Sequence, residues 1–365
     1  MPTDRHTSPE SRGRKTSPGR GGMPLPDLKG MTLPDLEAFF AELGEPRYRA
    51  DQVASWLFAR GVAGFDEMTN LSKSLRERLA QAARVTSSTT VVHERSGIDG
   101  TEKLLLEFEG TGDRIEAVVL RDEDRTTGCI SSQVGCRFGC RFCATGAMGL
   151  TRSLTAGEIV EQIQALRRAV APDRLNNLVY MGMGEPLDNY DEVMRSIRIA
   201  NARWGLGIGA RRMTISTSGI VPGIRRLAAE GLQINLAVSL NAPVQELRAH
   251  LMPVAARYPL DMLMDALRGY ISSVGRLITL EYVLLRGIND SPEMACLLGD
   301  IAAELFCRVN LICYNEVSDV AYAPPTDETV SRFMTALRRR CPTVVRRISR
   351  GGDISAACGQ LHTRS

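Results

Sequence analysis

Three cysteines stand within the segment 135–143 (GCRFGCRFC), with the spacing C-x3-C-x2-C. Three thiolates can ligate three irons of a 4Fe-4S cluster and leave the fourth iron open to another ligand. A structural zinc site usually takes four protein ligands, commonly as two C-x2-C pairs, and no second pair follows here. Cysteines that merely pack in a core are a third alternative, but Gly and Arg surround these three. The spacing therefore favours a cluster held by Cys136, Cys140 and Cys143.

Two more cysteines stand apart from this loop. Cys129 lies seven residues before Cys136, and Cys358 lies in a small-residue segment near the C-terminus. A lone cysteine is most often a small buried hydrophobe, and that interpretation also covers Cys296, Cys307, Cys313 and Cys341. The count of nine cysteines is odd and the N-terminus lacks an export signal, so a disulfide scaffold is not expected.

From about residue 126, apolar runs typical of strands alternate with helical patterns. The strand-like runs are Cys129–Ser131, Leu178–Met181, Met213–Ser216, Ile234–Val238, Ile278–Leu284 and Val309–Cys313. The helical patterns are 155–166, which opens with a capping box, Tyr190–Ala202, Val221–Glu230, Pro259–Ser273, Pro292–Leu305 and Asp327–Arg340. This alternation predicts an α/β fold whose parallel sheet has right-handed crossovers and is either open or curled into a partial barrel.

In such a fold the chemistry belongs at the carboxyl ends of the strands. Gly184 follows the second strand and would let the backbone approach a ligand, and Glu185 could accept hydrogen bonds from an ammonium group. Other residues at strand ends are Ser216, Ser239, Leu240, Asn241 and Asn315. Each polar residue among them, taken by itself, fits two interpretations equally well: it makes a hydrogen bond at its strand end, or it contacts a cofactor. Their shared edge favours a cofactor site.

The remaining segments differ in composition. Residues 1–22 contain five basic and two acidic residues and no large aliphatic residue, so we expect a disordered tail. Residues 23–88 read as a helical accessory domain and 89–125 as a strand-rich extension or linker. Residues 126–349 hold the alternating core, and 350–365 form a C-terminal segment with Cys358.

The charge of the chain is unevenly placed. The net charge is only +3, yet residues 331–365 carry eight Arg against one Asp. Local charge therefore permits a nucleic-acid partner although the total does not indicate one. The 44% hydrophobic content is typical of a globular protein, and no apolar run is long enough to span a membrane.

The cysteine loop after the first strand of a β/α series resembles the radical S-adenosylmethionine (SAM) superfamily. Within it, the chain resembles the radical SAM rRNA adenine-C2 methyltransferase family over nearly its whole length beyond the tail. The motifs that carry this resemblance are Gly44–Ala50, Asp66–Leu71, Cys129–Cys136, Met181–Pro186 and Asp353–Leu361. It implies a partial (β/α)6 radical-SAM barrel with a small N-terminal helical domain, a short β extension and a C-terminal cysteine-bearing segment.

The resemblance also implies an activity, methylation of C2 of adenosine 2503 in 23S rRNA, with adenosine 37 of tRNA as a further substrate of some members. One SAM would methylate Cys358. A second SAM, at the cluster, would give a 5′-deoxyadenosyl radical that removes a hydrogen from the S-methyl group. The methylene radical would add to C2, and Cys129 would then attack the Cys358 sulfur and release the base through a disulfide.

Further expectations follow from the same resemblance. Glu116 aligns with a carboxylate that handles protons near the base, although by itself it reads as a strand residue facing solvent. The helical domain and the Arg-rich end are candidates for phosphate contact; the arginines are Arg338, Arg339, Arg340, Arg346, Arg347 and Arg350. We expect a cytoplasmic monomer served by a flavodoxin- or ferredoxin-type electron donor.

Three residues or segments depart from the family pattern: Asn241 replaces a frequent His, Cys313 a common Pro, and 316–319 a loop with Pro and Gly. Two alternatives to the C2 methyltransferase stay open. One is a paralogue with the same chemistry at another adenine position, C8, or on another RNA. The other is a non-catalytic iron-sulfur protein that binds RNA.

Overall fold

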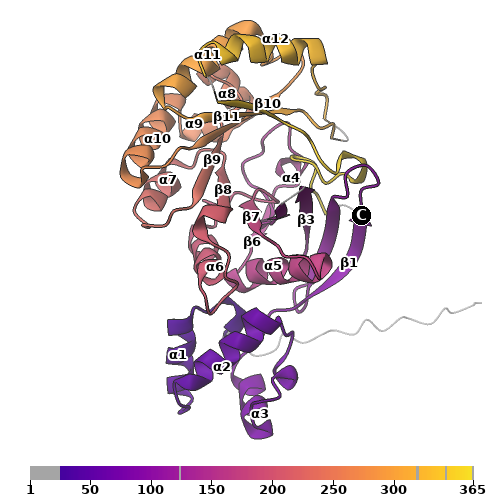
Figure 1. Ribbon diagram of the computed structural model, residues 1–365, viewed down its shortest axis with the longest axis vertical. Coiled ribbons are helices and arrows are strands. Elements are labelled where there is room, and N and C mark those ends of the chain that lie inside the picture. The colour runs from indigo at the N-terminus through magenta and orange to yellow at the C-terminus, as the bar shows by residue number, and fades with distance from the viewer. Residues whose placement is uncertain (1–24, 123–124, 318–319, 342, 364–365) are drawn as a thin grey trace, which may run out of the picture.

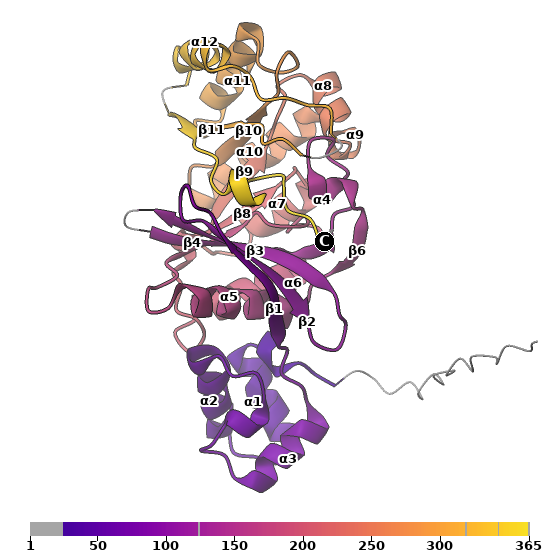
Figure 2. The same ribbon diagram turned by 90° about the vertical axis from the view of Figure 1, so that its right-hand side faces the viewer.

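The computed structural model describes residues 25–363, apart from 123–124, 318–319 and 342. The predicted disordered tail of residues 1–22 lies outside the described residues. A helical subdomain comes first and lies at the bottom of Figures 1 and 2. Its elements are η1 (Leu28–Gly30), α1 (Leu33–Glu42), α2 (Tyr48–Ala54), a π-helical turn η2 (Ser55–Arg60), η3 (Phe65–Glu67) and α3 (Lys73–Ala82).

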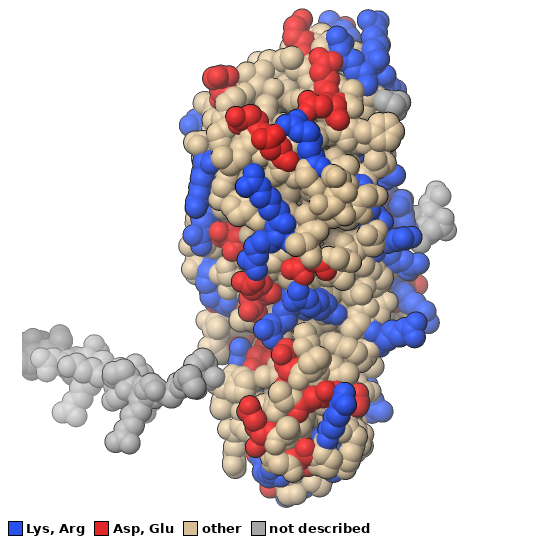
Figure 3. Space-filling model, turned by 90° about the vertical axis from the view of Figure 1, so that its left-hand side faces the viewer, with Lys and Arg blue, Asp and Glu red and all other residues tan. Residues whose placement is uncertain are grey.

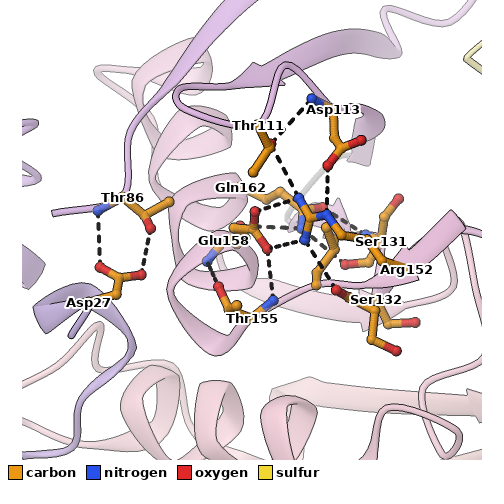
Figure 4. Close-up of polar contacts among 12 residues, drawn as sticks. Asp27, Thr86, Thr111, Asp113, Ser131, Ser132, Arg152, Thr155, Glu158 and Gln162 are labelled. Atoms are coloured by element: carbon orange, nitrogen blue, oxygen red, sulfur yellow. Dashed lines mark hydrogen bonds and ion pairs between the residues drawn. The ribbon is translucent and has the colours of Figure 1, made fainter. Parts of the chain in front are cut away.

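Polar contacts attach this subdomain to the rest of the chain. The fully buried ammonium group of Lys29, on η1, lies 2.5 Å from a carboxylate oxygen of Glu161 on α5 (Ala156–Val170). Asp27 accepts hydrogen bonds from the backbone and the hydroxyl of Thr86, just before the first strand (Figure 4). A buried charge pair of this kind is costly to break because the remaining charge would be left unpaired.

One continuous sheet of ten strands runs through the rest of the chain. Its order is β1 (Ser88–Arg95), β2 (Glu102–Phe108), β3 (Arg114–Asp122), β4 (Arg125–Cys129), β7 (Asn177–Tyr180), β8 (Met213–Thr217), β9 (Asn235–Ser239), β10 (Thr279–Leu284), β11 (Arg308–Cys313) and β12 (Val344–Arg347). β1 to β4 are antiparallel neighbours, and β4 to β12 are parallel. A separate hairpin is formed by β5 (Gln133–Gly135) and β6 (Leu150–Ser153).

Five of the six predicted parallel strands are observed to within one residue at either end. The first is displaced, because the predicted run Cys129–Ser131 begins where β4 ends. β4 instead uses Arg125 to Gly128, which hold no large apolar residue, since its inner face lines a polar interior. Strand β12 was not predicted for the same reason, because its residues Arg346 and Arg347 line this interior and give no apolar run.

Helices cover the outer face of the parallel strands, while β1 to β3 extend the sheet beyond β4 (Figures 1 and 2). The covering helices are α5, α6 (Tyr190–Asn201), α7 (Val221–Ala228), α10 (Leu260–Val274), α11 (Pro292–Glu304) and α12 (Asp327–Arg338). Shorter helices α4 (Ala144–Ala147), α8 (Gln245–Leu251) and α9 (Val254–Arg257) lie in the loops. Among the described residues, no helix combines the length and the apolar character needed to cross a membrane.

Candidate functional site

The three loop cysteines come together at the carboxyl edge of the parallel strands. Cys136, Cys140 and Cys143 all line a cavity of about 180 Å³, called the small cavity below. Gly135 starts their loop at φ 78°, where an added Cβ would lie 1.9 Å from the carbonyl oxygen of Gly149. A glycine is therefore required for the β5–β6 hairpin to close above the loop.

These thiols suit an iron-sulfur cluster. Burial raises the pKa of Cys136 to about 12 and the pKa of Cys140 well above its usual value, and neighbouring thiolates raise both further. Three adjacent, partly buried thiolates need a cationic partner to stay ionised, which metal ligation supplies. Within the described residues, no group of three Cys, His, Asp or Glu side chains is placed to hold a single metal ion. A cube places each thiolate on a different iron.

Side chains of α5 hold the strands that flank this loop (Figure 4). Gln162 accepts from the backbone N–H of Ser131 at 2.8 Å and donates to the Ser131 carbonyl at 3.0 Å. Arg152, on β6, makes two hydrogen bonds to Glu158, at 2.7 and 2.8 Å, and a third to Asp113 at 2.6 Å. The cluster loop is therefore held on both sides, at β6 and at the segment just before β5.

Gly184 and Glu185 both line the small cavity. Gly184 has φ 96°, and an added Cβ would lie 2.6 Å from the Cβ of Gln133, so packing against Gln133 is what demands the glycine. The buried carboxylate of Glu185 accepts from the backbone and hydroxyl of Ser218 at 2.7 and 2.8 Å. Burial raises the pKa of Glu185, and these hydrogen bonds counteract that rise.

The remaining predicted cofactor contacts divide into two groups. Ser216, Ser239 and Asn241 line the small cavity, whereas Leu240 is fully buried and is not part of its lining. The amide oxygen of Asn241 accepts from the backbone N–H of Val283 at 2.8 Å, and its backbone has φ 58°. Its side chain therefore stabilises a strained turn.

Asn315 is also outside the lining of the small cavity. Its amide donates to the carbonyl of Cys358 at 3.1 Å. The sequence identified it by its position after a strand, but the C-terminal segment folds back over that strand end and takes the hydrogen bond. Asn315 thus holds the segment that carries Cys358.

Cys129 and Cys358 are brought together although 229 positions separate them in the sequence. Cys129 ends β4 and is buried, and Cys358 is exposed. Burial raises the pKa of Cys129 to about 12; a Cys358 thiolate raises it as well, and the Arg347 guanidinium lowers it. Conversely, the charge of a Cys358 thiolate is the main cause that raises the pKa of Arg347. Burial lowers this pKa, and smaller contributions from Glu281 and Cys129 raise it. The two sulfurs and this guanidinium form one electrostatic group.

Cys358 lies where two cavities meet. A larger cavity of about 740 Å³, called the large cavity below, occupies the inner side of the parallel strands and is lined by Cys129 and Cys358. Four residues line both cavities: Met181, Ile312, Arg347 and Cys358. A group attached to Cys358 can therefore face either the cluster loop or the large cavity.

The large cavity is strongly basic. Its described lining holds one carboxylate, Asp122, and seven arginines, which are Arg121, Arg125, Arg211, Arg212, Arg346, Arg347 and Arg350. On the face drawn in Figure 3, basic side chains gather along the right-hand edge and mix with acidic ones elsewhere. Of the six predicted phosphate-contact arginines, three are paired with carboxylates: Arg340 with Asp300, Arg346 with Asp327 and Arg350 with Asp122.

The structure changes one part of the expectation for Glu116, its exposure to solvent. It is buried rather than solvent-facing, and it is part of neither cavity lining. One carboxylate oxygen lies 3.1 Å from the ammonium group of Lys103, and the other accepts from the backbone N–H of His362 at 2.8 Å. Because β3 runs beside the C-terminal segment, Glu116 holds the chain four residues beyond Cys358.

Sequence reasoning missed two buried charged residues at this site. Glu281 lines the small cavity, and one of its oxygens has no hydrogen-bond partner among the described residues. Arg248, on α8, is fully buried beside Cys140, and burial lowers its pKa to about 10. Glu281 interrupts an apolar strand, and that interruption was its only signal in the sequence, whereas Arg248 has polar neighbours and gave no signal.

The other four cysteines are free and mostly structural. Cys307 and Cys341 are buried, and Cys296 contacts Arg340 on the outer helices. Cys313 ends β11 without lining either cavity.

A three-cysteine loop at the carboxyl edge of a partial β/α barrel defines a radical SAM enzyme. Family models agree: residues 26–85 match the ribosomal RNA large subunit methyltransferase N-terminal domain, and 130–298 match the radical SAM superfamily. A crystal structure of a radical SAM methyltransferase from Sphaerobacter thermophilus superposes with a TM-score of 0.89 and 46% identity, covering 93% of this chain and 100% of that one.

Curated relatives give the family. A probable dual-specificity RNA methyltransferase RlmN from Symbiobacterium thermophilum is 46% identical over 89% of this chain and 88% of its own length. A protein of the same description from Bacillus cytotoxicus is 44% identical over 90% of this chain and 91% of its own. The chain belongs to the RlmN family of radical SAM RNA methyltransferases. It is a SAM-dependent enzyme that acts on RNA, so the non-catalytic alternative is set aside.

Proposed function

We propose that the chain methylates C2 of adenosine 2503 in 23S rRNA and, as a second substrate, adenosine 37 of tRNA. The observation that carries this proposal is the position of Cys358, between the cluster loop and a basic cavity and beside Cys129. Adenine C2 is an electron-poor carbon without a lone pair, so it cannot simply attack the methyl group of SAM. A methyl carrier that faces both the radical source and the base meets this difficulty.

Cys136, Cys140 and Cys143 would hold the 4Fe-4S cluster, and Glu185, Ser216 and Ser239 would contact SAM in the small cavity. Bound there, cluster and SAM would supply an electron and a 5′-deoxyadenosyl radical. The β5–β6 hairpin and Glu185 hold their positions without cluster or SAM. Gln162 and Arg152 fix the hairpin, and Ser218 fixes the carboxylate of Glu185. The site is thus preorganised by the chain itself.

Cys358 would accept a methyl group from a first SAM, and a second SAM would be consumed to remove one hydrogen atom from that methyl. The methylene radical on Cys358 would add to C2, and the adduct would restore the aromatic ring by losing the C2 proton and one electron, which the oxidised cluster would take up. A Cys129 thiolate would then attack the Cys358 sulfur, so that an S–S bond forms as the S–C bond breaks, and the methylene carbon left on the base would take up a proton to become the methyl group. Two electrons from an external donor, of flavodoxin or ferredoxin type, would reduce the disulfide again.

RNA would enter through the large cavity. A base must leave its stack to reach Cys358, and RNA-modifying enzymes read such splayed bases largely through shape and phosphate contacts. Arg211 and Arg212 line the large cavity just before the start of β8, and no carboxylate pairs with them among the described residues. We assign these two arginines and the helical subdomain to phosphate contact, and infer a monomer that works in the cytoplasm.

The test is an anaerobic reaction of the cluster-loaded enzyme with SAM, reductant and unmodified 23S rRNA or tRNA, followed by mass spectrometry of the nucleosides. C2-methyladenosine is the expected product, whereas C8-methyladenosine would overturn the assignment of position. C358A should make no methyladenosine yet still cleave SAM, because the cluster loop is untouched. C129A should stop with RNA covalently attached to Cys358, visible on a denaturing gel. Full methylation by either variant would contradict the thiol mechanism.

A further inference from the structure

Arg248 is the most deeply buried charged side chain near the cluster loop. Its exposed fraction is 0%, and its one hydrogen bond goes from a terminal nitrogen to the carbonyl of Ser218 at 2.7 Å. Its Nε and its other terminal nitrogen have no partner, and no carboxylate pairs with it within the described part of the chain. A buried, unpaired guanidinium costs several kcal/mol unless an anion compensates it.

The surroundings of Arg248 indicate which anion this is. The Cys140 thiolate is the one charged group that raises its pKa. The end of α8 is joined to the cluster loop, since the backbone N–H of Arg141 donates to the carbonyl of Leu251 at 3.0 Å. An added Cβ at Gly219 would lie 2.9 Å from the guanidinium, so the chain leaves room for it there.

Arg248 is not part of the lining of the small cavity, whereas Cys140 is. The guanidinium therefore does not line the space in which SAM would bind. A residue that met the carboxylate of SAM would have to face that space. This leaves the Cys140 thiolate as the anion that acts on Arg248.

We propose that Arg248 is the buried counter-charge of the iron-sulfur cluster and makes the cluster easier to reduce. This inference rests on the proposed cluster site at Cys136, Cys140 and Cys143. One-electron reduction adds a negative charge to the cluster, and a fixed positive charge in a low-dielectric site stabilises the more negative state. Removal of the charge should therefore lower the midpoint potential.

The experiment is an anaerobic redox titration of reconstituted full-length protein without SAM, followed by electron paramagnetic resonance. R248M, which keeps the length of the side chain and removes its charge, should weaken reduction at least tenfold, about 59 mV for a one-electron couple. R248K keeps the charge and should stay within about threefold of the wild type. R167M is the matched control, because Arg167 is a half-buried arginine on α5 whose guanidinium donates to the carbonyl of Phe58 in the helical subdomain at 3.4 Å. It should leave the potential unchanged.

Failure of the proposed cluster site and failure of the charge effect of Arg248 give different results. A wild-type protein that binds no iron and sulfide would refute the cluster site itself. An unchanged potential in R248M, or an equal shift in R248K, would overturn the role of the charge. If R248M changed only the SAM dissociation constant, the anion would be SAM. Thermal unfolding of the cluster-free protein completes the test: R248M should be at least as stable as the wild type, and marked destabilisation would make Arg248 structural.

Discussion

Replacing Glu116 by alanine is expected to release the segment that carries Cys358. The carboxylate accepts from the backbone N–H of His362 at 2.8 Å and lies 3.1 Å from Lys103. Lys103 keeps a second partner, Glu94, at 3.0 Å, so the substitution leaves no orphaned cation. The main loss is the hydrogen bond to the segment.

The size of the effect follows from that bond. A hydrogen bond to a charged group contributes about 1.5–3 kcal/mol, and about 1.4 kcal/mol is a factor of ten in an equilibrium. Local opening of the segment should therefore become roughly 10- to 100-fold more frequent. Two other attachments remain, from Ala144 to the Gly359 carbonyl at 2.8 Å and from Thr145 to the Leu361 carbonyl at 2.6 Å. Global unfolding should change less than this local opening.

Hydrogen exchange of the amides in 357–363 measures the opening, and peptide mapping of alkylated Cys358 gives a second reading of it. E116Q keeps an acceptor for His362 and should fall between the wild type and E116A. E107A is the control, because Glu107 pairs with Arg114 on the neighbouring strand without contacting the segment. If exchange stayed at the wild-type rate while methylation was lost, Glu116 would act on protons at the base, as the resemblance implied.

Two further predictions concern the cofactor side of the site. G184A should lower the free energy of unfolding in urea by about 2–4 kcal/mol, because backbone strain at φ 96° adds to a contact of 2.6 Å between the new Cβ and Gln133. The control G207A, with φ 70° and open space around the Cβ, should lower it by about 1 kcal/mol. Equal losses would refute the packing argument. Burial raises the pKa of Glu281 above 4.5, so the fold favours its neutral form. Its contribution to stability is complete below pH 4.5 and is lost as the pH rises through the folded pKa. The stability of the wild type relative to E281Q should fall over that range in urea titrations, and a difference independent of pH would contradict it.

The sequence by itself determined the features that depend on neighbours along the chain. The spacing of Cys136, Cys140 and Cys143 lies within one loop, and most helix and parallel-strand ends follow from periodicity and caps such as the Thr155–Glu158 box. Gly184 and Glu185 could be found because their strand ends at the reactive edge. Local patterns suffice where the chemistry or the turn is local.

Only the tertiary structure decided which partners the isolated residues meet. Three meetings join segments more than 100 residues apart: Cys129 with Cys358, the carboxylate of Glu116 with the backbone of His362, and Arg248 with Cys140. No period or spacing encodes such a meeting, and the free energy of a charged group depends on burial and partners rather than on its sequence neighbours. That is why Glu116 read as an exposed strand residue and Arg248 escaped notice, although the fold buries both of them.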